Sequence, residues 1–253
     1  MIVIGLGTGR SGTASLAHLL NSQTNSMCFH ELNPSCMRFT GTVQPALNTI
    51  YEFQNIIKGG ETSHLTVDLS REISLAPYDK LCQMDKVELI GDIAMYYLTY
   101  VEDILKLNPT VKFVCLKRDK NETVKSWLNK TQIKRWRSKK LADYFYSIIS
   151  RTPYFEEYNY WEENDCLSIK KDPIWDKCFP KFTASNKEEA IRMYWEYYYN
   201  EAEQLAQQYS QNFKIFDISL LNNNEGQSEV LSFCGLNKDR QIFTKAHLHS
   251  FPR

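Results

Sequence analysis

The sequence lacks the features that mark several classes of protein. Basic and acidic side chains are balanced, 30 of each in 253 residues, so the formal net charge is zero. This balance argues against a general nucleic-acid-binding protein, which is expected to be basic. No apolar run approaches the roughly 20 residues of a membrane-spanning helix, and no charged segment followed by an apolar one marks a leader. We therefore expect a soluble cytoplasmic protein that binds no nucleic acid and spans no membrane.

Cysteine pairs are also missing. The seven cysteines are scattered, and none of them forms a C-x-x-C pair. Reduced thiols in a cytosolic protein fit this pattern better than a disulfide framework or a zinc site. No cluster of His, Cys and Asp has the spacing of metal ligands, so no metal is expected. The hydrophobic content of 43% suits a single α/β domain over residues 1–253.

The most informative stretch is the first twenty residues. Residues 1–6 are apolar and largely β-branched, which predicts a buried strand, and small and apolar residues after Ser11 predict a helix. Between them lies a turn that contains Gly5, Gly7, Gly9 and Gly12. A strand, a glycine turn and a helix aim main-chain N–H groups at an anion, to which Arg10 adds a positive charge. This stretch therefore predicts a loop that binds phosphate or sulfate.

Two known nucleotide-binding patterns match this loop in part. A Walker A loop, G-x-x-x-x-G-K-[ST], would need glycine in place of Ile4 and lysine in place of Arg10. A dinucleotide fingerprint, G-x-G-x-x-G, is satisfied over residues 7–12, and Glu31 lies near the position of its ribose-binding acid. A nucleotide kinase or NTPase and an NAD(P)-dependent reductase are therefore both open alternatives, as is a nucleotide-binding regulatory module without activity.

Strand and helix patterns alternate along the rest of the chain. Strands are expected over residues 26–29, 87–93, 111–116 and 213–218, and a strand or an extended piece is expected over 64–69. Helices are expected over residues 44–58, 95–107, 120–129, 186–209 and 228–234, with Asp119 and Asn186 as caps. This alternation predicts a three-layer α/β fold with a mainly parallel sheet. An irregular, aromatic-rich insert is expected around residues 144–180.

Polar side chains follow two of these strands at their carboxyl ends. His30 and Glu31 are candidate general bases after the second strand. Arg118 comes just after the strand over 111–116, and Ser126 lies on the helix that follows. An arginine and a hydroxyl in this arrangement can converge on one anion, and the surrounding segment is rich in Lys and Arg.

The loop and the later strand together resemble the sulfotransferase superfamily, whose members bind 3′-phosphoadenosine 5′-phosphosulfate (PAPS). The segment Gly9-Arg10-Ser11-Gly12-Thr13 is similar to their 5′-phosphosulfate loop. The arginine at a strand end with a serine eight residues later is similar to their 3′-phosphate site. The resemblance implies that PAPS is bound by Gly9, Arg10, Ser11, Gly12, Thr13, Ala14, Arg118 and Ser126.

The same resemblance implies catalytic residues. In the tyrosylprotein and heparan sulfate branches a catalytic Glu lies about twenty residues after the basic residue of the loop, and Glu31 lies 21 positions after Arg10. Glu31 is thus favoured over His30 as the base, and Arg10 would stabilise the leaving group. These families often have a Lys-x-Pro motif near the end of the strand that precedes the 3′-phosphate strand. Neither Lys nor Pro stands at that place here, where Asp92 is instead a possible second carboxylate of the site. Their glycine-rich cofactor loop is not recognisable in residues 236–253, where Lys245 or His247 is a possible substitute.

The resemblance implies sulfuryl transfer from PAPS to a hydroxyl group, with 3′,5′-diphosphoadenosine as the product. The acceptor would be a glycan, a lipid or a small molecule, with a peptide tyrosine as a further possibility, held beside the aromatic insert. No metal is needed for this chemistry.

Overall fold

The computed structural model describes residues 1–33, 42–68, 72–131 and 186–245, together with the single residues 145, 148, 149, 182 and 184. They form two compact units. Of the described residues, the first unit holds 1–118 and 198–245, and the second holds 119–131, 186–197 and the single residues. None of the helices in this described part combines the length and the apolar composition that a membrane crossing requires.

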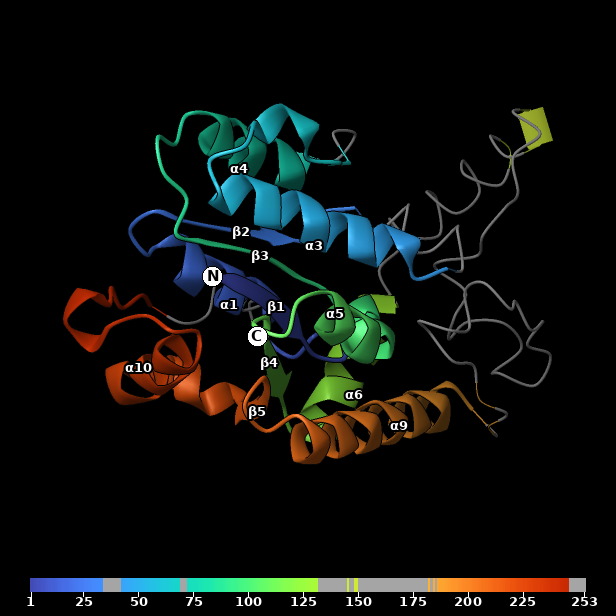
Figure 1. The fold of residues 1–253 in the computed structure, drawn as a ribbon. Helices are drawn as coiled ribbons and strands as arrows, with labels where there is room; N and C mark the ends of the chain where they lie inside the picture. Colours follow the sequence, from blue (N-terminus) through green and yellow to red (C-terminus); the bar gives the residue numbers. More distant parts are fainter. Residues whose placement is uncertain are drawn as a thin grey trace. The chain divides into compact units, whose positions relative to one another are not determined.

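The first unit is built on a five-stranded, all-parallel sheet with the strand order β2-β3-β1-β4-β5 (Figure 1). The strands are β1 (Ile2–Leu6), β2 (Ser26–His30), β3 (Leu89–Ile93), β4 (Lys112–Lys117) and β5 (Phe213–Asp217). Every residue of β1 and β3 is buried, as expected for central strands of a parallel sheet that is covered on both faces. The prediction of an α/β fold with a parallel sheet is confirmed.

Helices cover both faces of this sheet. They are α1 (Thr13–Asn21), α3 (Gln44–Ile57), α4 (Glu72–Cys82), α5 (Val101–Leu107), α10 (Asn224–Phe233) and the carboxyl-terminal part of α9 (Lys187–Gln208). Short 3₁₀ helices complete the unit: η1 (Thr62–His64), η2 (Met95–Tyr100), η4 (Ile218–Asn222) and η5 (Lys238–Arg240). Side chains of α1 and α10 share one core with the sheet. Figure 1 shows α3 and α4 on the opposite side of the strands from α10.

The spacing of apolar residues explains how the helices pack. In α3 the buried residues Ala46, Ile50 and Phe53 recur every three or four positions, so they form one stripe that faces β1 and β3. In α1 the buried residues Leu16 and Leu20 lie one turn apart and contact the other face. Side chains of the helices thus cover both faces of the sheet.

The second unit contains α6 (Lys120–Thr131) and the amino-terminal part of α9. Asp119 caps α6 by accepting a hydrogen bond from the N–H of Glu122 at 2.9 Å, and Asn186 caps α9 in the same way. Both predicted caps are confirmed. Lys120 forms an ion pair with Glu196 at 2.8 Å, which joins the two helices within this unit.

Most predicted elements are confirmed, but three segments differ. The segment over 64–69 was expected to be a strand or an extended piece, and its described part contains no strand. The 3₁₀ helix η1 ends at His64, Leu65 is extended, and Thr66 is held by the carboxylate of Glu52, which accepts from its N–H and its hydroxyl at 2.9 Å each. The helix over 95–107 is divided into η2 and α5. Helix α10 begins four residues before Ser228, because Asn223 caps it through the N–H of Gly226.

Two predictions cannot be compared with the structure. The aromatic insert around 144–180 lies outside the described residues except for residues 145, 148 and 149. The single domain over 1–253 stays a prediction. Helix α4 was not predicted at all; it carries Pro77 in its interior, which weakens the helical signal of that segment.

Candidate active site

The predicted site residues of the first unit meet at one edge of the sheet. Because all strands are parallel, their carboxyl ends lie on the same side, and β3 separates β2 from β1. The glycine loop over 7–12 follows β1, His30 ends β2, and Arg118 follows β4. Such an edge, at the point where the strand order reverses, is where ligands bind in open α/β sheets.

The loop has a main-chain conformation that its glycines make possible. Positive φ angles occur at Gly9 (69°), Arg10 (58°) and Gly12 (89°), and Gly7 has a φ of 152°. A Cβ atom on Gly7 would lie 2.2 Å from the Oγ atom of Ser11, so no other residue fits at that position. The loop ends on the first turn of α1, whose N–H groups have no partner within the helix. The geometry is that of an anion-binding loop.

The side chains of Ser11 and Thr13 face different surroundings. Ser11 is completely buried and its hydroxyl lies beneath the loop against Gly7. The hydroxyl of Ser11 therefore lies on the inner side of the loop and has no contact with solvent. Thr13 begins α1 and its Oγ1 atom lies 3.1 Å from Nε2 of His30, which links the loop to the end of β2.

Two arginines meet beside the loop. Nη1 of Arg118 donates a hydrogen bond to the main-chain carbonyl of Arg10 at 3.1 Å. Burial lowers the pKa of Arg10, and the positive charge of Arg118 lowers it further. Since an anion reduces the repulsion between two guanidinium groups and offers acceptors to both, this arrangement favours a negatively charged ligand.

The carboxylate candidates lie at the ends of β2 and β3. Glu31 is half-buried and has a left-handed main chain, with a φ of 57°. Asp92 is completely buried: Oδ1 accepts from the N–H of Leu32 at 3.0 Å, and Oδ2 accepts from the hydroxyl of Tyr97 at 2.9 Å. Asp92 is thus enclosed by protein and has no surface that an acceptor substrate could contact. Glu31 and His30 lie at the edge formed by the carboxyl ends of the strands.

The family of the chain follows from its similarity to known proteins. The sequence model of the sulfotransferase domain matches residues 2–220. The chain belongs to the sulfotransferase domain family. No curated protein matches it. The crystal structure of a sulfotransferase from Alicyclobacillus acidocaldarius is similar at 11% identity with a TM-score of 0.46, over 99% of this chain and 86% of that one.

Two tyrosines of α9 contact the glycine loop and the neighbouring strand of this sulfotransferase domain. The hydroxyl of Tyr198 accepts from the N–H of Gly7 at 3.0 Å and donates to the carbonyl of Met95 at 3.2 Å. The hydroxyl of Tyr199 donates to the carbonyl of Leu116 at 2.7 Å. Both rings are buried, and their hydroxyl contacts carry no local sequence signal because the partners are distant in the chain.

Ala14 and Ser126 are the remaining residues that were predicted to bind the cofactor. Ala14 is the second residue of α1 and is half-buried. Ser126 is half-buried on α6 in the second unit, and its joint role with Arg118 stays a prediction.

The tail after η5 is held by glutamine side chains. Gln23 exchanges two hydrogen bonds with the main chain of Ile242, and Gln227 does so with Thr244, at 2.7–2.9 Å. Lys245, which follows, is exposed, and His247 lies outside the described residues. A cofactor contact by either one stays a prediction.

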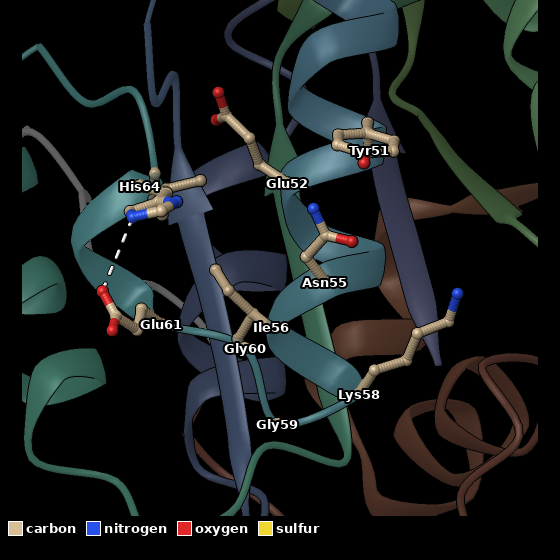
Figure 2. A pocket seen from close by; sticks show the side chains of 10 residues that line it. Tyr51, Glu52, Asn55, Ile56, Lys58, Gly59, Gly60, Glu61 and His64 are labelled. Atoms are coloured by element: carbon tan, nitrogen blue, oxygen red, sulfur yellow. Dashed lines mark ion pairs between the residues drawn. The ribbon is translucent and has the colours of Figure 1, made fainter.

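A separate hollow of about 770 Å³ lies along the carboxyl-terminal half of α3 and η1 (Figure 2). Its lining includes the ion pair between Glu61 and His64, with 3.5 Å between the charged atoms, and Figure 2 shows the Lys58 side chain apart from this pair. None of the predicted site residues lines it. Within the described ranges, no group of His, Cys, Asp and Glu is arranged to hold a metal ion.

Proposed function

We propose that this sulfotransferase transfers a sulfuryl group from PAPS to a hydroxyl group of a glycan, a lipid or a small molecule. The observation that carries the proposal is the meeting of Arg118 and Arg10 beside a glycine loop at a helix N-terminus. PAPS has two separate anionic groups. It therefore suits a site in which two arginines, Arg10 and Arg118, follow two different strands of the sheet.

The residues present fit such a cofactor. The main-chain N–H groups of residues 9–13 and the guanidinium of Arg10 would hold the 5′-phosphosulfate, and Arg118 with Ser126 would hold the 3′-phosphate. Gly7 and Gly12 carry no Cβ atom, which would lie 2.2 Å from Ser11 and 2.6 Å from Ile218, and Tyr198 holds the loop through the N–H of Gly7. When bound, the cofactor supplies an activated sulfuryl group, and 3′,5′-diphosphoadenosine is the leaving group.

Glu31 is the proposed general base. Its carboxylate takes the proton of the acceptor hydroxyl while that oxygen attacks, and it becomes a neutral carboxylic acid. Arg10 and the loop N–H groups stabilise the negative charge that develops on the leaving oxygen. As in phosphoryl transfer, positioning and electrostatic stabilisation supply most of the rate. His30 is the second candidate for the base, and its contact with Thr13 also lets it orient the start of α1.

The proposal is tested by following the release of 3′,5′-diphosphoadenosine from PAPS with a panel of glycan, lipid and phenolic acceptors. Acceptor-dependent release by the wild-type chain, lost in Arg10→Ala and kept in the distant surface variant Lys58→Ala, is the expected result. Turnover of ATP or of a nicotinamide cofactor without any use of PAPS would instead favour the kinase or reductase hypothesis and overturn the proposal.

A further inference from the structure

Glu31 is held in a main-chain conformation that side chains rarely adopt. Among the described residues only Arg10, Asn25 and Glu31 combine a side chain with a clearly positive φ. Asparagine tolerates this conformation, whereas arginine and glutamate are unusual there. Such strain persists only where the surrounding structure holds it, and it gathers at functional sites.

The peptides on both sides of Glu31 are held by β3. The N–H of Glu31 donates to the carbonyl of Ile93 at 3.1 Å. The N–H of Leu32, one residue later, donates to the carboxylate of Asp92 at 3.0 Å. The hydrogen bond from Glu31 continues the ladder between β2 and β3. The hydrogen bond from Leu32 ends that ladder, because its acceptor is a side chain and not a main-chain carbonyl. The chain therefore turns at Glu31 and not one residue earlier or later.

Asp92 is itself fixed in place. Its Oδ2 atom accepts hydrogen bonds from Tyr97 at 2.9 Å and from Tyr96 at 3.4 Å, both on η2. The other titratable groups that face it are Glu31, after β2, and Cys28, on β2. A buried carboxylate with donors on both oxygens and no exposed surface has no access to a substrate. The role of Asp92 therefore lies in the groups that it binds within the protein.

We propose that Asp92 is a positioning residue, which fixes the peptide after Glu31 and thereby sets the direction in which the Glu31 carboxylate leaves the main chain. This inference rests on the proposed function, because it gives Glu31 a proton to accept. Burial raises the pKa of Asp92 to about 6, and the N–H of Leu32 and the hydroxyl of Tyr97 oppose that rise.

Two substitutions separate the hydrogen bond of Asp92 from its charge. Asp92→Asn keeps an oxygen that accepts from Leu32 and removes the charge, and Asp92→Leu removes both in a similar volume. We expect Asp92→Leu to lower kcat about tenfold to a hundredfold, with the KM for PAPS within about twofold, since a small displacement of a reacting group has an effect of this size. Asp92→Asn should restore most of the turnover.

A second measurement does not depend on activity. Amide hydrogen exchange at Leu32 should be at least about tenfold faster in Asp92→Leu than in the wild type or Asp92→Asn, with the strands of the sheet unchanged. Unchanged exchange at Leu32 would overturn the positioning role whether or not the chain is active. In an active chain, a kcat for Asp92→Leu within about twofold of wild type would overturn it too. A wild-type chain that uses no PAPS, with Leu32 still released in Asp92→Leu, would contradict the proposed function alone.

Discussion

The guanidinium of Arg118 lies across the end of β4 and donates its hydrogen bond to the main-chain carbonyl of Arg10, 108 positions earlier in the chain. Two arginines that are remote in sequence are thus joined through one main-chain atom of the glycine loop. The contact holds the loop at Arg10, where the main chain is left-handed.

Removal of the Arg118 guanidinium should weaken cofactor binding more than it weakens the fold. In Arg118→Ala the affinity for 3′,5′-diphosphoadenosine should fall about tenfold to a hundredfold, because a charge-assisted hydrogen bond is lost. Titration calorimetry checks this, with Lys214→Ala as a control, since Lys214 forms an exposed ion pair with Glu229. Equal affinities in Arg118→Ala and the wild type would exclude a direct role for Arg118.

Replacement of Glu31 should act on turnover and not on binding. Glu31→Gln should lower kcat about a hundredfold to ten-thousandfold, the usual contribution of a general base, with cofactor affinity unchanged. His30→Gln is the matched comparison. If Glu31→Gln keeps near-normal turnover while His30→Gln loses it, the base is His30.

Loss of the Tyr198 hydroxyl should loosen the phosphate loop. In Tyr198→Phe the buried N–H of Gly7 and the carbonyl of Met95 both lose a partner. We expect the free energy of unfolding to fall by about 1–3 kcal/mol, the effect of leaving a buried polar group without a hydrogen bond. Urea unfolding measures it, and Tyr51→Phe, which changes an exposed ring on α3, should have no effect. Equal losses in the two variants would contradict the role of Tyr198.

The carboxyl group of Asp92 should make stability depend on pH. Its pKa is about 6 in the folded chain against an ordinary value of 3.8. Between these values the folded chain keeps a proton that the unfolded chain has lost, so this stabilising contribution is present at low pH and is lost as pH rises through about 6. From pH 4 to 7 the wild type should lose on the order of 3 kcal/mol of unfolding free energy relative to Asp92→Asn. A difference between the two chains that does not change with pH would contradict this burial effect.

The sequence predicted those features that depend on neighbouring residues. The strand, glycine turn and helix of residues 1–20 follow from local apolar pattern and glycine placement, and the structure has β1, the loop and α1 there. The strands β3 and β4 were likewise visible as apolar runs. The pairing of Arg10 with Arg118 could be expected from family resemblance, because two motifs in a fixed order imply a shared ligand.

The sequence could not predict contacts between distant polar side chains. Leu32 and Asp92 are 60 positions apart, and Gly7 and Tyr198 are 191 positions apart. Such pairs arise only when the strand order brings β3 beside β2 and α9 beneath the loop. Asp92 was therefore expected to be a possible catalytic carboxylate, whereas its complete burial gives it a supporting place. The same limit applied to Ser11, whose hydroxyl turns inward because Gly7 leaves room for it.

The most direct test of the account is a thermal-shift comparison of 3′,5′-diphosphoadenosine with 5′-AMP, ATP and NAD, each at the same concentration, on the wild-type chain. A ligand that binds only the folded state raises the melting temperature, and at equal concentrations a ligand with a lower Kd raises it more. We predict a clearly larger shift with 3′,5′-diphosphoadenosine than with 5′-AMP, because only the former places a phosphate at Arg118 as well as at the glycine loop. A larger shift with ATP or NAD, or no shift with any of the four, would contradict the PAPS site.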